Sequence, residues 1–547
     1  MSHATNQRLA PLVARHQQST YLPRPPDDRE RDLYLGPQHR WVVPVSFLGY
    51  ILVVIGLSFF IMRRSWADWL AVPLFVSTLG TTVSLFTSSR RRRISLAGHR
   101  ALVESWVPDY IPSVDVFLPS AGEDLEVLRN TYGYVAKLEW PGDLIVYVLD
   151  DSGRNAVREL AHHHGFVYLS RPDRGHYKKA GNLRYGFARS VGDHIAILDA
   201  DFVPRSDFLF ELAPYMDDQS VGIVQSPQYF DIERRMNWLQ RAAGGTQVLF
   251  YRWVQPSRDR SDAAICVGTC ALYRRTALER SGGFALIGHS EDVHTGVNLM
   301  KVGYRVRYVP AIVGKGICPD TFSQFVTQQY RWCTGSMSLL FSRGFHQIDL
   351  SFMQRLSYWS GFLYYITTAI NIFTIPLPPI MMGYFAAPDV RASNYVFVTL
   401  ALVVRQAIVP LITAGRESLF GLARIQATYS FSHAVALFDV LRNRTDGWVA
   451  TGAAQGSPTA RRVLRLARVW LISVQLALWG AIAWDTSRYG FGRYWFMSGF
   501  ALLNLYVAYP ILLGRSQLPR LPWRLPALRR PAWPAPRRGR HEARGAS

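Results

Sequence analysis

Two aspartates separated by one residue follow a short apolar run near the middle of the chain. Residues 194–198 are rich in Ile, Leu and Ala, and Asp199 and Asp201 come directly after them. In an open α/β sheet, ligands bind just outside the carboxyl ends of the strands. Two carboxylates at such an end suit Mg²⁺ or Mn²⁺ holding a substrate diphosphate. A plain turn is the alternative, because Asp is a common turn residue.

A second apolar run, residues 144–149, also ends in carboxylates, Asp150 and Asp151, which precede Ser152 and Gly153. Adjacent carboxylates that face one cleft can divide the work. One accepts N–H and O–H groups of a base or ribose, and another lies near the metal. The alternative is an Asx turn before a helix. Two acidic strand ends in one region favour a nucleotide-sugar site.

Lys178 and Lys179 lie between the two acidic strand ends, just before a Gly-Asn pair at a predicted helix start. Lysines in this position can meet phosphate through their ammonium charge and through the backbone N–H groups of the helix start. Basic residues on a turn are usually only solvated, so this signal gains weight from its neighbours.

Ser290, Glu291 and Asp292 form a third acidic motif. Transfer of a sugar to a hydroxyl group needs a base that removes the acceptor proton as the new bond forms. A carboxylate near the metal-bound donor fits that role. The alternative is a helix cap, with Ser290 as the cap and the acids in the first turn. Both interpretations are compatible.

Gln328, Arg331 and Trp332 have the spacing i, i+3, i+4, which places them on one face of a helix. An indole is a stacking platform for a sugar ring, and Gln and Arg can hold hydroxyl groups or a leaving diphosphate. An amphipathic helix whose Trp lies at a membrane interface is the alternative.

The charge of the chain is strongly positive, with a formal net charge of +22. The excess lies beside apolar runs and in the last thirty or so residues, which the positive-inside bias of membrane proteins explains better than nucleic-acid binding. The four cysteines lack zinc spacing and are interpreted as reduced packing residues. The first forty residues contain no apolar core of a cleaved signal peptide.

Apolar runs of membrane length flank a polar middle. We expect six crossings, at 41–62, 67–87, 357–386, 394–414, 468–486 and 494–513, with a kink at the prolines 376, 378 and 379. The four arginines 90–93 favour a cytosolic middle region. Within it, strands are expected at 114–118, 144–149, 166–169, 195–198 and 221–225. Helices near 124–138, 154–164, 180–189 and 205–215 alternate with them, which predicts a mostly parallel α/β sheet.

The ordered set of motifs resembles that of processive family 2 glycosyltransferases, and of bacterial cellulose synthase catalytic subunits in particular, over roughly residues 41–513. Shorter runs add to the resemblance, namely residues 114–119, 179–182, 224–228 and 268–269. The resemblance implies a cytosolic GT-A-like nucleotide-sugar transferase domain inserted between transmembrane helices. It also implies an inverting, processive enzyme of the plasma membrane that makes a β-linked polymer.

The resemblance also implies roles for individual residues. Asp150 and Asp151 would bind the nucleotide, Lys179 would lie near the donor phosphates, and Asp199 and Asp201 would hold Mg²⁺ or Mn²⁺. Asp292 would be the general base. Gln328, Arg331 and Trp332 would contact the acceptor and diphosphate, and Trp448 and Thr451 would belong to a gating loop over the donor.

The expected segments follow from these assignments. They are a disordered cytosolic N-terminus (1–40), a transmembrane hairpin (41–87), the cytosolic domain with an interface helix (88–355), a transmembrane pair (356–414), an interface helix with the gating loop (415–467), a second hairpin (468–513) and a basic disordered tail (514–547).

The most favoured reaction is polymerisation of UDP-glucose into a cellulose-like or mixed-linkage β-glucan and its export. Chitin-, hyaluronan- or mannan-like products stay open, as does non-processive transfer to a lipid. A transporter with an inactive sheet domain would have eroded acidic motifs, and these are intact. Accessory export proteins are possible partners, whereas nucleic acid and a cyclic-di-GMP-binding domain are not expected.

The chain departs from the usual family pattern in three places. Ser120 to Glu123 replaces a segment that carries an aromatic residue beside the nucleotide. Ser290 stands where Thr is usual, and Phe202 stands where a His often follows the two aspartates.

Overall fold

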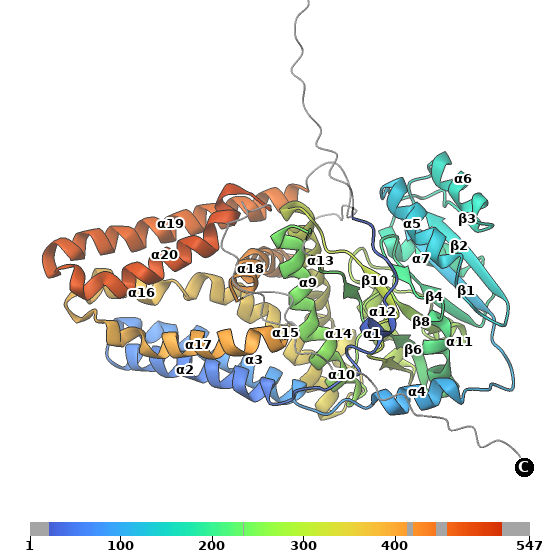
Figure 1. The fold of residues 1–547 in the computed structure, drawn as a ribbon, viewed down its shortest axis with the longest axis horizontal. Coiled ribbons are helices and arrows are strands. Elements are labelled where there is room, and N and C mark those ends of the chain that lie inside the picture. Colours follow the sequence, from blue (N-terminus) through green and yellow to red (C-terminus); the bar gives the residue numbers. More distant parts are fainter. Residues whose placement is uncertain (1–20, 234, 413–418, 445–456, 517–547) are drawn as a thin grey trace, which may run out of the picture.

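The computed structural model describes residues 21–233, 235–412, 419–444 and 457–516. Two parts lie at opposite ends of the molecule, an α/β domain and a bundle of long apolar helices (Figure 1).

A seven-stranded sheet with the order β3-β2-β1-β4-β8-β6-β9 forms the centre of the α/β domain. All neighbouring pairs are parallel except the two that involve β8, which runs against the rest. The expected mostly parallel sheet is therefore confirmed. The strands are β1 (Val114–Ser120), β2 (Leu144–Asp150), β3 (Val167–Leu169), β4 (His194–Ile197), β6 (Val221–Gln225), β8 (Ala271–Arg274) and β9 (Arg305–Tyr308).

Helices cover both faces of this sheet, and the side chains of β1 show why. Val116 and Leu118 pack with Leu128 in one apolar cluster, whereas Phe117 packs with Leu183 in another. All seven residues of β1 are buried, as a strand covered on both faces requires. The helices of the domain are α5 (Leu125–Val135), α6 (Asn155–His163), α7 (Lys178–Phe187), α8 (Phe208–Leu212), α11 (Arg275–Arg280) and α12 (Glu291–Lys301).

A small second sheet stands beside the ends of the large one. Its strands are β5 (Val203–Pro204), β10 (Gly314–Gly316) and β7 (Tyr229–Phe230), in that order. Because β5 follows Asp201 directly and pairs antiparallel with β10, this sheet fixes the chain just beyond the two aspartates. Its two- and three-residue strands are too short to show a period in the sequence.

Within the described ranges, five helical segments are long and apolar enough to cross a membrane, namely Val42–Met62, Ser65–Ser88, Phe352–Phe385, Pro458–Tyr489 and Phe491–Leu513. The predicted kink is present, since α15 (Phe352–Thr374) ends just before Pro376 and α16 (Leu377–Phe385) begins just after it. The other helices of the bundle are α2 (Val42–Met62), α3 (Ala71–Ser88), α17 (Val396–Ile412), α19 (Pro458–Tyr489) and α20 (Phe491–Leu513).

The sixth expected crossing, 394–414, differs from the other five. It corresponds to α17, whose 17 described residues are fewer than those of the five long segments. This helix packs along α2. The expected crossing at 468–486 lies inside α19, which begins at Pro458 and so extends into the segment expected to precede it.

The interface helix expected in the segment 415–467 corresponds to α18 (Leu419–Leu441), which lies between the two parts of the molecule (Figure 1). It packs on α9 (Trp238–Leu249), α13 (Phe322–Leu340) and α15. Two of its buried polar side chains bind neighbouring helices. Asp439 accepts a hydrogen bond from the Tyr330 hydroxyl (2.9 Å), and Arg424 donates to the Tyr506 carbonyl oxygen (3.2 Å).

The join between α9 and the domain is a continuous helical run in which a π turn (Phe250–Val254) leads into α10 (Gln255–Asp259). The arginines at the end of α3 bind this run rather than standing free. Arg90 donates from its backbone to the Ser257 hydroxyl (3.0 Å), and Arg93 pairs with Asp262 (3.0 Å). The arginine cluster, from which we expect a cytosolic middle region, therefore also connects the bundle to the domain. The short α14 (Arg343–His346) connects α13 with α15.

Residues 21–36 form a strap on the surface of the α/β domain, whereas the sequence led us to expect disorder up to residue 40. Tyr34 and Leu35 are buried. Arg31, in α1 (Asp28–Arg31), pairs with Glu211 (3.0 Å), and Glu30 pairs with Lys315 of β10 (3.0 Å). The polar composition that indicates disorder here serves ion pairs with the domain. Glu211 also contacts His99 of α4 (Leu96–Glu104) at 2.5 Å.

Candidate active site

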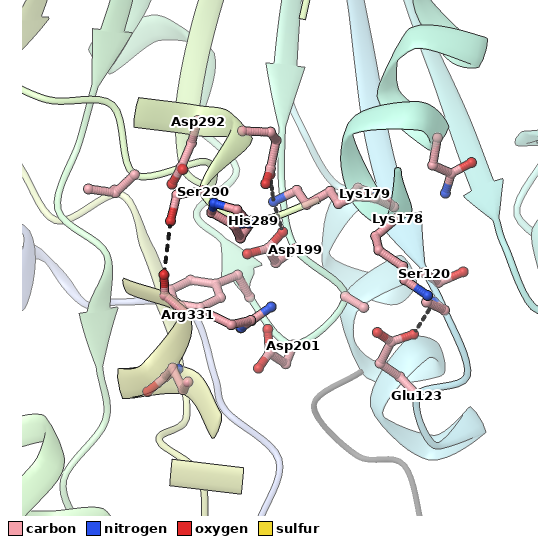
Figure 2. Close-up of a pocket in the computed structure, with 18 of the residues that line it drawn as sticks. Ser120, Glu123, Lys178, Lys179, Asp199, Asp201, His289, Ser290, Asp292 and Arg331 are labelled. Carbon is pink, nitrogen blue, oxygen red and sulfur yellow. Dashed lines mark hydrogen bonds and ion pairs between the residues drawn. The ribbon is translucent and has the colours of Figure 1, made fainter. Parts of the chain in front are cut away.

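A cavity lies at the carboxyl-terminal edge of the large sheet, closed on one side by α12 and α13 (Figure 2). Since β1, β2 and β4 are parallel and in register, their last residues reach the same edge. Eight of the residues predicted from the sequence line this cavity: Asp151, Lys179, Asp199, Asp201, Asp292, Gln328, Arg331 and Trp332.

Asp199 and Asp201 follow β4 and are held through their backbone. The Asp199 N–H donates to the Thr269 hydroxyl (2.9 Å), and the Thr131 hydroxyl donates to the carbonyl oxygen of Ala200 (2.7 Å). Burial, together with repulsion from Asp199 and Glu123, raises the pKa of Asp201 to about 7. Figure 2 shows both aspartates on the cavity side of the chain. The site thus concentrates negative charge where water is scarce.

These two aspartates fit a divalent cation. Carboxylate oxygens are the ligands that Mg²⁺ prefers. Among the described residues, no three or more His, Cys, Asp or Glu side chains are arranged to hold a metal ion. The protein would therefore supply one or two carboxylates, and phosphate oxygens and water would complete the shell. This division is the usual one for Mg²⁺ at nucleotide sites.

Lys179 connects three segments of the cavity wall. From the first turn of α7 its ammonium group pairs with Asp199, donates to the carbonyl oxygen of Gly268 (2.8 Å) and lies 3.8 Å from Glu291. Burial alone would lower the pKa of Lys179, but attraction to Asp199 and Glu291 outweighs it and raises the pKa. The lysine therefore stays charged and offsets part of the negative charge.

Asp292 lies in the first turn of α12, where its carboxylate accepts the N–H of Val293 (2.8 Å). Burial, with repulsion from Glu291, raises the pKa of Asp292 to about 7. A carboxylate whose pKa is near neutrality is suited to general-base work. The opposing loop approaches closely, since a Cβ on Gly268 would lie 3.0 Å from the Asp292 side chain.

The backbone at Ser290 is strained and held in place from outside. Ser290 has φ of 50°, in the left-handed region. A Cβ on Gly335 would collide with the Ser290 side chain, so α13 can approach only because residue 335 is glycine. Ser290 is the N-cap residue of α12 and both acids lie in the first turn, as the alternative interpretation expects. Its side chain, however, makes no capping hydrogen bond and instead donates to the Arg331 carbonyl oxygen (3.4 Å).

Asp151 is clamped by a buried arginine. Arg171 donates to both carboxylate oxygens of Asp151, at 2.6 and 2.7 Å, and its side chain is 1% exposed. The same guanidinium donates to the carbonyl oxygens of His176 (2.5 Å) and Lys178 (3.1 Å). It thus fixes the turn before Lys179, which contains two left-handed residues, Tyr177 and Lys178.

Asp150 does not line the cavity, which differs from its expected direct role in nucleotide binding. Its carboxylate accepts hydrogen bonds from the Ser152 and Arg154 backbone (2.9 and 3.0 Å) and from the Tyr168 hydroxyl (2.9 Å). The side chain is fully buried. Asp150 thus forms the Asx turn that was the alternative interpretation, and it orients Asp151 through the backbone.

Gln328, Arg331 and Trp332 share the face of α13 that lines the cavity, as their spacing predicts. The opposite face, with Tyr330 and Cys333, is buried in the core. Burial lowers the pKa of Arg331 from its ordinary high value, which still leaves the guanidinium charged at neutral pH. Trp332 therefore lies at the cavity rather than standing alone at a membrane surface. Trp448 and Thr451 fall outside the described residues.

Sequence reasoning did not single out Arg171, although one signal marks its position. It follows β3, which is the parallel neighbour of β2, and so it lies at the same edge of the sheet as Asp151. Glu123 was noted only as a departure from the usual pattern. It lines the cavity, and its carboxylate accepts the N–H of Ala121 (2.7 Å). Burial raises the pKa of Glu123, with repulsion from Asp199 adding to the effect.

Residues 194–411 match the family model described as "Glycosyl transferase family group 2". The chain is 33% identical over 266 residues to the UDP-forming cellulose synthase catalytic subunit of Xanthomonas axonopodis pv. citri, covering 46% of this chain and 36% of that one. It is 33% identical over 237 residues to the cellulose synthase 1 catalytic subunit of Komagataeibacter xylinus, covering 42% and 32%. The chain thus spans about a third of the length of these relatives.

Among solved structures, the fold is similar to a mannosyltransferase from Pyrobaculum calidifontis in complex with GDP-Man and Mn²⁺. The TM-score is 0.47 at 17% sequence identity, covering 72% of this chain and 99% of that one.

Arg171 is a positioning residue whose loss should weaken nucleotide binding. Arg171→Leu removes both donors from the Asp151 carboxylate and two hydrogen bonds to the adjacent turn. We therefore expect UDP affinity to fall at least about tenfold, the scale of one to three kcal/mol for a charged hydrogen bond. Arg171→Lys keeps the positive charge but not the bidentate contact, so its UDP affinity should lie between those of the parent and Arg171→Leu. Calorimetric UDP titrations measure this. Arg129→Leu, at an exposed position on α5, is the control. If Arg171→Leu binds UDP as tightly as the parent, Arg171 is not a positioning residue for the nucleotide.

Proposed function

We propose that this chain, which carries a family group 2 glycosyltransferase domain similar to that of cellulose synthase catalytic subunits, is a processive hexosyltransferase. It takes the hexosyl group of a UDP-sugar, most simply UDP-glucose, and adds it with inversion to a growing β-glucan. The α/β domain faces the cytosol, and the polymer leaves across the plasma membrane through the helix bundle.

One observation carries this proposal. A single cavity gathers the acidic ends of β2 and β4, the Asp292 carboxylate and the polar face of α13, and α13 packs directly on α18 at the base of the helix bundle. A donor site, a base and an acceptor site thus adjoin the part of the molecule that contains the apolar helices. The identity of about 33% to UDP-forming cellulose synthases supports the choice of donor.

Each residue has a defined task in the proposed reaction. Asp151, fixed by Arg171, accepts hydrogen bonds from the uridine. Asp199 and Asp201 would hold the divalent cation, which when bound neutralises the negative charge of the diphosphate. Lys179 keeps Asp199 in place and adds positive charge beside the phosphates. Arg331 meets the diphosphate from the other wall.

Bond formation is then a single displacement. The acceptor hydroxyl oxygen attacks the anomeric carbon, Asp292 takes the hydroxyl proton, and the bond from carbon to diphosphate oxygen breaks with release of UDP. Attack from the face opposite to the leaving group converts an α-linked donor into a β-linkage. Trp332 stacks against the acceptor sugar and so fixes the distance at which the hydroxyl oxygen approaches.

Asp292→Asn should preserve UDP binding while slowing transfer by roughly two to four decades, because loss of a general base has that scale. The parent should also gain activity as the pH rises through neutrality, since the raised pKa of Asp292 leaves the base protonated in acid. Initial rates of UDP release from pH 5.5 to 8.5 measure both effects. Asp109→Asn, at an exposed position, is the control. A variant rate within tenfold of the parent would exclude Asp292 as the base.

Removal of the metal should stop transfer, and either Mg²⁺ or Mn²⁺ should restore it. Asp201→Asn should weaken UDP binding at least about tenfold when metal is present. Substituting a residue that only supports a metal ligand already lowers metal affinity about tenfold or more, and Asp201 would be a ligand itself. It should not weaken binding in excess chelator. Calorimetric titrations with and without metal distinguish the two conditions. Full activity of the parent in excess chelator would contradict the metal site.

Trp332→Ala should shorten the product more than it weakens donor binding. Aromatic contacts add on the order of 1 kcal/mol, and a misplaced acceptor costs roughly a hundredfold in rate. Gel filtration of product made from labelled UDP-glucose in vesicles gives its length. Trp495→Ala, at a half-exposed position on α20, is the control. A parent that makes only a monosaccharide–lipid would favour the non-processive alternative. Full-length polymer at the parental rate from the variant would remove Trp332 from the acceptor site.

A further inference from the structure

His289 lines the cavity, yet none of the tasks above uses it. Its Nε2 atom is buried and has no hydrogen-bond partner among the residues that the structure describes. Nearly all buried side-chain polar atoms in folded proteins have a partner, and leaving one without costs free energy. A buried ring nitrogen that lines a substrate cavity therefore indicates a ligand as the missing partner.

The backbone next to His289 is held in place. His289 precedes Ser290, whose left-handed backbone is locked by the close approach of α13 at Gly335. The Ser290 hydroxyl also donates to the carbonyl oxygen of Arg331, in the helical turn that carries Trp332. A side chain anchored in this way can present one nitrogen at a fixed point, which a selective contact needs.

The protonation state suits a neutral, polar partner. Burial lowers the pKa of His289, so the ring is uncharged at neutral pH. A neutral imidazole offers one donor and one acceptor, which matches a hydroxyl group better than a phosphate. In the view of Figure 2, the ring is drawn between Asp199 and the segment from Ser290 to Asp292. Asp199, His289 and Asp292 all line this one cavity.

We infer that His289 hydrogen-bonds a hydroxyl group of the hexose on the nucleotide donor, and so takes part in selecting the sugar. The inference rests on the proposed hexosyl transfer. It adds a residue that recognises the hexose rather than the nucleotide. Sites that hydrogen-bond a substrate hydroxyl reject analogues lacking it, because the site's own polar group is then left unpaired.

The test combines His289→Phe with four UDP-glucose analogues, each lacking one ring or exocyclic hydroxyl at positions 2, 3, 4 or 6. Phe keeps a planar ring but removes both nitrogens. With the parent, one analogue should lose about three- to tenfold in kcat/KM, the scale of one hydrogen bond. His289→Phe should lose a similar factor with UDP-glucose and nothing further with that same analogue. The first-turnover release of UDP is the readout, so that chain termination does not interfere.

Two controls separate the contact from a general effect. UDP itself should bind parent and His289→Phe equally, because the nitrogen contacts the sugar. His162→Phe, at an exposed position on α6, should behave as the parent throughout. His289→Asn keeps a donor and an acceptor, so it should retain discrimination against the same analogue. This variant replaces His289→Phe in the test if the Phe variant does not fold.

Three results would overturn the inference. The first is an unchanged kcat/KM for UDP-glucose in His289→Phe, and the second is a loss of UDP affinity equal to the loss with UDP-glucose. The third is that, for each of the four analogues, the variant loses the same factor in kcat/KM on removal of the hydroxyl group as the parent does. Failure of the proposed function gives a different result. The parent would then release no UDP from any UDP-hexose, and the role of His289 would fall with it.

Discussion

The ion pair between Lys179 and Asp199 is the interaction on which the cavity depends. Parallel strands that end at one edge bring carboxylates together, and α12 adds Glu291 and Asp292 from the other side. Burial, with repulsion from neighbouring carboxylates, raises the pKa values of Asp201 and Asp292 to about 7. Lys179 offsets part of that repulsion, and a divalent cation with its diphosphate would change the balance further. The free site is thus built for a ligand that brings its own cation.

The second wall of the cavity is tied to the helix bundle by buried polar contacts. Tyr330, next to Arg331 on α13, donates to Asp439 of α18 (2.9 Å), and Arg462 of α19 pairs with the same carboxylate. The Asp439 side chain is 5% exposed and that of Arg462 is 48% exposed, so a buried carboxylate receives donors from two other helices. The face of α13 that carries Gln328 and Trp332 is therefore fixed relative to the apolar helices. In the proposed function, this contact keeps the acceptor face of α13 beside the helices through which the polymer would leave.

Sequence patterns predicted the parts of the molecule in which one residue property repeats. The buried strands β1, β2, β4 and β6 read as continuous apolar runs, and the face of α13 follows from its i, i+3, i+4 spacing. Strand ends and motif order brought eight site residues into one cavity. The antiparallel β8 (Ala271–Arg274) was not predicted, because its four residues end in an arginine and are not followed by an acidic motif that would mark a strand end. The ordered strap, residues 21–36, was not predicted. Its charged residues resemble those of a disordered segment, but they pair with Glu211 and Lys315, which are far along the chain. The roles of Arg171 and His289 were not predicted, because a single residue forms no repeating pattern in the sequence. Their importance lies in contacts between segments that only the fold brings together.

Linkage analysis of the product made by the purified full chain tests the central claim most directly. Separate reactions would contain UDP-glucose, UDP-galactose, UDP-N-acetylglucosamine or GDP-mannose, each with Mg²⁺ or Mn²⁺. The account predicts that UDP-glucose yields a chain of many β-linked glucose residues, with UDP as the other product. A product limited to one sugar on a lipid, or α-linkages, would contradict a processive inverting synthase. Absence of transfer from every donor would contradict a transferase of any kind.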